Sequence, residues 1–128
     1  MIRVLIVDDS RFMAKALRTV LEGLEYNVVG VAHDGLEALA LYSEQKPDVM
    51  LLDITMPNMD GVECLQRALQ SDPEASVIML SAIKDPEIID QCMKSGAKAF
   101  LQKPIRGTSP TDICRLSEAI DQAVGKAV

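Results

Sequence analysis

The sequence predicts an α/β fold in which helices cover both faces of a single parallel sheet. Five short apolar runs, rich in β-branched residues, alternate along the chain with segments of helical periodicity. The runs are continuously apolar, as is typical of strands buried on both faces. Five strand–helix units in succession give a doubly wound sheet, because right-handed crossovers place helices on both of its faces.

The five apolar runs give the positions of the expected strands. The runs IRVLIV, NVVGVA, DVMLLD, ASVIMLS and KAFLQK predict strands at 2–7, 27–32, 48–53, 75–81 and 98–103. The helix after the first strand is amphipathic, with charged residues on the face opposite its apolar residues. Its expected core face consists of Met13, Leu17, Val20, Leu21 and Leu24.

The other helices begin at recognisable caps. DGLE at 34–37 and DGVE at 60–63 each offer Asp as N-cap, with a Glu three residues later to reach back to the N–H of the cap. DPE at 85–87 and SPTD at 109–112 predict the starts of the last two helices, and Gly96 predicts the end of the fourth.

Composition and charge exclude two classes of function, direct nucleic-acid binding and membrane insertion. A chain of 128 residues with a net charge of -6 is one domain by size and lacks the basic surface that direct nucleic-acid binding needs. Met1 leads into the first strand and no apolar stretch could span a bilayer, so we expect a cytoplasmic protein without membrane insertion. The three widely spaced cysteines are expected to be buried thiols.

Chemically distinctive residues stand at the ends of the expected strands. In an open parallel sheet, ligands bind beyond the carboxyl ends of the strands, and all strands end at the same edge. The first strand delivers Asp8 and Asp9 there, the third Asp53, the fourth Ser81 and the fifth Lys103. These residues are remote in sequence, so their convergence predicts a site.

The residue types indicate phosphoryl chemistry. Three clustered carboxylates repel one another unless cations offset them, and Mg²⁺ prefers such oxygen ligands and works with phosphates. Asp53, alone on a central strand, is the best nucleophile for forming an acyl phosphate, whereas Asp8 and Asp9 suit the metal and its water. Ser81 and Lys103 would stabilise the phosphoryl oxygens. His33, after the second strand, is interpreted as a turn residue.

Four segments match a known family. VLIVDDS, LLDITMPNMDG, LSA and GAKAFLQKP, in this order and at these separations, resemble the receiver domain of two-component response regulators, of the stand-alone CheY-like chemotaxis type. The resemblance covers essentially the whole chain. It implies a flavodoxin/CheY-like fold, strand order 2-1-3-4-5, and a single receiver domain over residues 1–128.

The resemblance also implies roles for individual residues. Asp53 would accept a phosphoryl group from a sensor histidine kinase or phosphotransfer protein. Asp9, Asp53 and the backbone carbonyl of Thr55 would be direct Mg²⁺ ligands, with Asp8 acting through water. Such a protein is a signalling protein that assists its own phosphorylation and slow dephosphorylation, and it is not otherwise an enzyme.

Signal output is likewise implied by the resemblance. Lys103 would pair with the phosphoryl group and be followed by a cis bond to Pro104. Ser81 and Phe100 would switch together and repack the face of the fourth helix, fifth strand and fifth helix for an unknown downstream protein. This sequence has Phe100 where Tyr is frequent and Ser81 where Thr is commoner, and its segment 105–111 is long.

Other functions stay open at this stage. The chain could be a receiver from a longer regulator with a DNA-binding or enzymatic output domain, or a degenerate receiver that only binds partners. A dehalogenase-type phosphatase would need a second Asp at position 55, which is Thr. A flavin or nucleotide binder would need glycine-rich phosphate loops that the sequence lacks.

Overall fold

A computed structural model describes residues 1–54, 56 and 59–125 of the chain. Within them, five parallel strands form one sheet in the order β2-β1-β3-β4-β5, as expected. The strands are β1 (Arg3–Val7), β2 (Asn27–Ala32), β3 (Val49–Asp53), β4 (Val77–Ser81) and β5 (Ala99–Gln102). The helices are α1 (Arg11–Gly23), α2 (Gly35–Gln45), α3 (Gly61–Ser71), α4 (Pro86–Ser95) and α5 (Pro110–Ala123).

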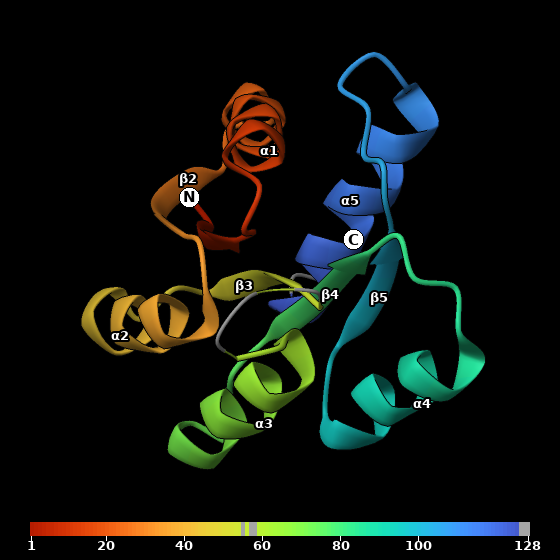
Figure 1. Ribbon diagram of the computed structural model, residues 1–128. Coiled ribbons are helices and arrows are strands. Elements are labelled where there is room, and N and C mark those ends of the chain that lie inside the picture. Colours follow the sequence, from red (N-terminus) through yellow and green to blue (C-terminus); the bar gives the residue numbers. More distant parts are fainter. Residues whose placement is uncertain (55, 57–58, 126–128) are drawn as a thin grey trace.

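The helices cover both faces of the sheet, with α1 and α5 on one side and α2, α3 and α4 on the other (Figure 1). Neighbouring residues of one strand therefore enter different cores. On β3, Leu51 packs with α1 and α5, and Leu52 packs with α2, α3 and α4. Burying one such side chain contributes roughly 1.5–3 kcal/mol, so two cores hold the central strand in place.

The apolar faces of the helices lie as the periodicity predicted. Of the expected core face of α1, Leu17 and Leu21 are buried and Met13, Val20 and Leu24 are partly buried. No helix in the described part of the chain is long and apolar enough to cross a membrane. The buried residues of the helices pack with the strands in the two cores of the sheet.

The predicted N-caps are present, but the reach-back of the capping boxes is wrong. Asp34 accepts from Glu37 N at 2.8 Å and Asp60 accepts from Glu63 N at 2.9 Å. The Glu37 carboxylate, however, accepts from His33 N, one residue before the cap, at 3.0 Å. Glu63 instead forms an ion pair with Arg67 at 2.7 Å. The extended cap residues thus satisfy one donor each, and the glutamates find other cations and donors.

The long segment after β5 is anchored to α5 by a buried acid. The bond between Lys103 and Pro104 is cis, as the resemblance implied. Ser109 caps α5, and Asp112 in the first turn accepts from Arg106 N at 3.1 Å and from the Arg115 guanidinium at 2.8 Å. Asp112 therefore ties the loop to the start of the last helix.

This anchor predicts pH-dependent stability. The hydrogen bond from Arg106 N and the Arg115 guanidinium lower the pKa of Asp112 below its usual range. Because the folded pKa is the lower one, the contribution is present at neutral pH and lost as the pH falls from about 4 through the lowered value. We expect Asp112→Asn to reduce Tm by a few degrees at neutral pH and the difference to vanish in acid. Circular dichroism melts across this pH range measure the difference.

The control is Asp90→Asn on α4, where an exposed acid pairs with Lys94 at 2.9 Å. Exposed i,i+4 pairs contribute about 0.3–0.5 kcal/mol, so this variant should leave Tm nearly unchanged. A difference between wild type and Asp112→Asn that stays constant from neutral pH into acid would contradict the anchoring role.

Candidate functional site

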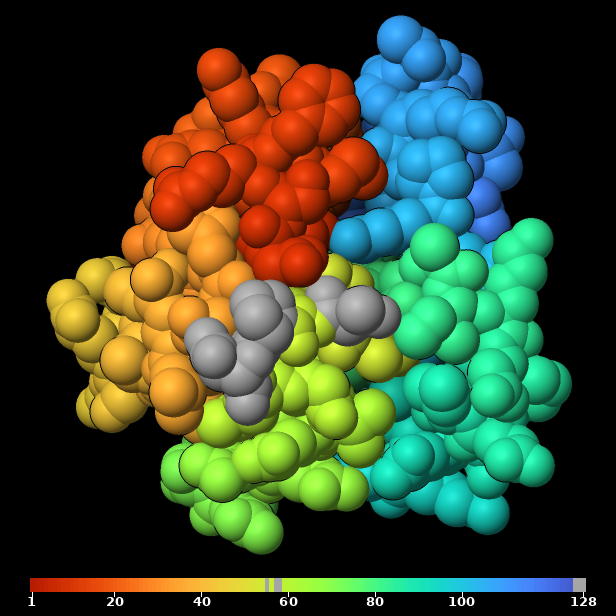
Figure 2. Space-filling view, in the orientation of Figure 1, coloured from red at the N-terminus to blue at the C-terminus, as the bar shows by residue number. Residues whose placement is uncertain are grey.

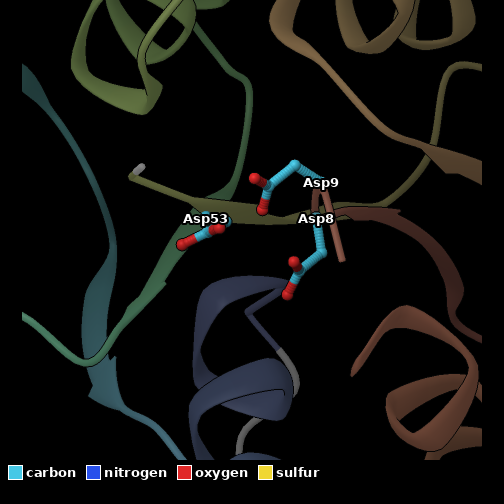
Figure 3. Close-up of side chains that lie close together, drawn as sticks. All are labelled: Asp8, Asp9 and Asp53. Carbon is cyan, nitrogen blue, oxygen red and sulfur yellow. The ribbon is translucent and has the colours of Figure 1, made fainter. Parts of the chain in front are cut away.

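Three carboxylates meet at the carboxyl edge of the sheet. Asp53 is the last residue of β3, and Asp8 and Asp9 follow β1, its neighbour in the sheet. One oxygen from each of the three lies within 4.8 Å of the others, and Figure 3 shows the side chains close together. Asp8 and Asp53 are 4% and 6% exposed, whereas Asp9 is exposed. The predicted convergence of these acids is therefore observed.

Lys103 brings a positive charge to the same place. The segments that follow β1, β4 and β5 converge on one face of the molecule (Figure 2). Lys103 Nζ lies 2.6 Å from Asp8 Oδ2 and 3.5 Å from Asp53 Oδ1, and its side chain is 18% exposed. One ammonium against three carboxylates (+1 and -3) leaves a local charge of -2. Such a site favours a divalent cation of matching charge.

The backbone of the β1–α1 loop is held from several directions. Asp8 N donates to Ala32 O of β2 at 3.0 Å, and Asp8 Oδ1 accepts from Ser10 N at 2.9 Å. Ser10 in turn caps α1 through Met13 N at 3.2 Å. The start of α1 and the end of β2 therefore fix where Asp8 and Asp9 stand.

Ser81 lies at the end of β4, beside the acids. It is 2% exposed, and its Oγ accepts from Ile83 N at 3.0 Å. The β4–β5 register pairs Met79 with Phe100 and Ser81 with Gln102. Because residues two apart on a strand share a face, Ser81 and Phe100 lie on the same face of the sheet. Half-buried Phe100 packs against the core under α2, α3 and α4.

Two further predicted site residues, Thr55 and Pro104, follow β3 and β5. Thr55, expected to offer its carbonyl to the metal, lies outside the described residues. Pro104 follows Lys103 through the cis bond at the end of β5.

Gly61 supports the site in a way that the sequence did not predict. In the sequence it is only part of the cap signal DGVE at 60–63. Gly61 N donates to Ile54 O at 2.7 Å, so α3 begins against the end of β3. A Cβ added at Gly61 would lie 2.6 Å from Ile54 Cα and closer still to the carbonyl oxygen of Asp53. Only glycine allows this approach without moving the backbone that carries Asp53.

The fold and the acidic site together define a doubly wound α/β domain with a candidate cation site at the carboxyl edge of its sheet. Residues 4–114 match the family model described as the response regulator receiver domain. The chain therefore belongs to the response regulator receiver family.

Individual relatives agree with this assignment. The chain is 41% identical to a chemotaxis protein CheY of Listeria monocytogenes over 96% of this chain and 98% of that one. A CheY of Bacillus subtilis is 36% identical over 95% of this chain and 97% of its own length. The solved response regulator domain of Thermotoga maritima CheB is 38% identical, with a TM-score of 0.87 over 100% of this chain and 99% of that one.

Proposed function

We propose that the chain accepts a phosphoryl group on Asp53 in a Mg²⁺-dependent reaction, from a phosphohistidine of a sensor kinase or phosphotransfer protein. The observation that supports this most is the placement of Lys103, which contacts Asp8 and Asp53 within a cluster of three acids. A structural ion pair would need one acid. The surplus carboxylates and the rigid, fully buried β3 suit a nucleophile held beside a cation site.

The donor set fits magnesium. Asp9 and Asp53 would be direct carboxylate ligands, with the Thr55 carbonyl completing the protein's share. Both oxygens of Asp8 already accept hydrogen bonds, from Ser10 N and Lys103 Nζ, which supports contact through water. The ion would neutralise charge on the phosphoryl oxygens.

The transfer itself is carried by Asp53. One of its carboxylate oxygens attacks phosphorus, and the P–O bond forms as the P–N bond of the donor phosphohistidine breaks. The electron pair of the broken bond stays with the donor imidazole nitrogen. The Lys103 ammonium, 3.5 Å from Asp53 Oδ1, pairs with a phosphoryl oxygen and balances its charge.

Output would begin at Ser81. The hydroxyl of Ser81 would donate a hydrogen bond to a phosphoryl oxygen. Ile83, whose N–H donates to the same Oγ, would move with it. The β4–α4 loop follows, and Phe100 repacks on the same face of the sheet. The face of α4, β5 and α5 then presents a different surface to a protein partner.

A solved relative supports a protein partner of this kind. The CheY of Borrelia burgdorferi was crystallised with CheX, BeF3 and Mg²⁺. That chain is 36% identical to this one, with a TM-score of 0.86 over 94% of this chain and 87% of that one. We therefore propose that a downstream protein binds this chain, and that the chain assists its own phosphorylation without acting as an enzyme on other substrates.

The proposal is tested with a small acyl phosphate donor. Intact-protein mass spectrometry should show a gain of one phosphoryl group in the presence of Mg²⁺ and none after chelation with EDTA. A gain that is independent of the metal, or no gain at all, would contradict the proposal.

Replacement of Lys103 gives a second prediction. In Lys103→Met, Nζ no longer competes for Asp8, so we expect Mg²⁺ to bind several-fold more tightly. Phosphorylation should nevertheless slow by about 100-fold, the usual cost of removing one charge-stabilising donor. Calorimetry measures the affinity and mass spectrometry the rate.

The matched control is Lys94→Met, which removes an equivalent charge from a side chain that is 77% exposed on α4. It should change neither quantity. Mg²⁺ binding in Lys103→Met that is no tighter than in the wild type would refute the competition between Lys103 and the metal. An unchanged phosphorylation rate would refute the stabilising role of Lys103.

A further inference from the structure

His33 follows β2 and lies beside the acidic loop. Strands β2 and β1 are neighbours, with Val7 opposite Ala32, so the residues after these strands are side by side. The half-buried imidazole places Nδ1 3.1 Å from the backbone oxygen of Asp8. Its other nitrogen, Nε2, lies 3.4 Å from the Arg11 guanidinium. A turn residue would need neither contact.

The two contacts require the same form of the ring. A carbonyl oxygen only accepts, so Nδ1 must carry the proton that it donates to Asp8. A guanidinium only donates, so Nε2 must be the acceptor toward Arg11. The neutral imidazole with its proton on Nδ1 satisfies both partners at once. The other neutral tautomer satisfies neither.

Asp8 is otherwise fully engaged. Its N–H donates to Ala32 O, one carboxylate oxygen accepts from Ser10 N and the other from Lys103 Nζ. The carbonyl is the remaining polar group, and His33 supplies its hydrogen bond. That carbonyl belongs to the peptide that joins Asp8 to Asp9, so its orientation decides how both side chains project toward the cation site.

The backbone of His33 is itself anchored. His33 N donates to the Glu37 carboxylate in the first turn of α2 at 3.0 Å. Arg11, on the far side of the ring, is the first residue of α1. His33 is thus held by its backbone at the start of α2, while its ring contacts Arg11 at the start of α1 and the carbonyl of Asp8 in the β1–α1 loop. These contacts give the ring a defined position beside the Asp8 carbonyl.

We propose that His33 is a positioning residue of the acidic site, and that its Nδ1–H fixes the Asp8–Asp9 peptide in the orientation that binds Mg²⁺. This inference rests on the proposed function, because it assumes that the acidic cluster binds the metal. It concerns a hydrogen bond made by the neutral ring, and it assigns no role to the positively charged form of the imidazole.

Two variants of nearly equal shape test the proposal. Asn and Leu both branch at Cγ, but only Asn places an N–H donor where His33 has Nδ1. We expect His33→Leu to weaken Mg²⁺ binding by about tenfold, the lower end of the usual effect of losing an outer-shell partner, and His33→Asn to restore most of it. Isothermal calorimetry on the full chain measures both affinities, and melting curves check that the two variants are equally stable.

A second readout needs no metal. At about pH 8.5, where an ordinary imidazole is neutral, ring ¹⁵N shifts should report the proton on Nδ1. Equal Mg²⁺ affinities for wild type and His33→Leu, equal losses in both variants, or a proton on Nε2 would each overturn the inference. If the wild type binds no Mg²⁺, the proposed function fails as well, whereas a failure confined to the variants leaves that function standing.

Discussion

Asp53→Asn is expected to reduce phosphoryl acceptance by at least about 1,000-fold, because an amide offers no carboxylate oxygen to attack phosphorus and losing a covalent nucleophile typically costs this much or more. Asn is close in size to Asp, so the buried end of β3 keeps its packing. The variant also removes one of the three neighbouring negative charges. The measurement is the rate of mass gain with a small acyl phosphate donor and Mg²⁺.

Asp60→Asn is the control for this experiment. Asp60 is an exposed acid in the same connection between β3 and α3, where it caps the helix through Glu63 N. Asn caps a helix about as well as Asp, so this variant should fold and accept phosphate like the wild type. Persistent phosphorylation of Asp53→Asn would contradict the assignment, as would an equal loss in Asp60→Asn.

Gly61→Ala is expected to destabilise the fold by about 3 kcal/mol, the upper part of the usual range for overpacking a tight site. The added methyl group would lie 2.6 Å from Ile54 Cα and 3.0 Å from the carbonyl carbon of Asp53. Both are backbone atoms at the end of a strand whose residues are all buried, so neither can move without disturbing the packing of the strand. Urea unfolding measures the loss of stability. Phosphorylation should also slow, because the backbone segment that the methyl group displaces carries Asp53.

Gly23→Ala provides the comparison. Gly23 is the last residue of α1, and an added Cβ there would have no neighbour within 4 Å. Alanine is favoured over glycine in a helix by up to about 1 kcal/mol, so this variant should be at least as stable as the wild type. Similar losses of stability in both variants would mean that the contact at Gly61 is not the cause.

The sequence located the strands closely where their ends carry clear signals. The expected strand at 27–32 coincides with β2. The expected strand at 75–81 begins two residues too early, because Ala75 N donates to Asp72 O in a turn that ends α3. Apolar character alone does not separate a buried turn residue from the first residue of a strand, and Ala75 is both apolar and buried.

The site was predictable because topology, and not local spacing, brings it together. Parallel strands end at one edge, so Asp8, Asp53 and Lys103 had to approach one another once the fold was known. Side-chain geometry was not predictable in the same way. Lys103 lies nearer Asp8 than Asp53, and this depends on which rotamers fit beside Ser10 N and the end of β5.

The contacts of His33 are a second case of side-chain geometry that the sequence did not predict. A single histidine after a strand carries no periodic or spacing signal, and its interpretation as a turn residue was reasonable on sequence alone. Its hydrogen bond to the Asp8 carbonyl follows from the pairing of β2 with β1, which the resemblance supplied as a strand order without contacts. Side-chain partners of backbone groups are set by distances that a sequence pattern does not contain.

Reductive trapping of the phosphorylated chain tests the central claim most directly. Borohydride reduces an acyl phosphate to an alcohol, so the residue that held the phosphoryl group is converted to a lighter one that peptide mass spectrometry can locate. The account predicts homoserine at position 53 alone, in samples treated with donor and Mg²⁺. Conversion at another acid, or a phosphoryl group that resists reduction as a serine or threonine ester would, contradicts it.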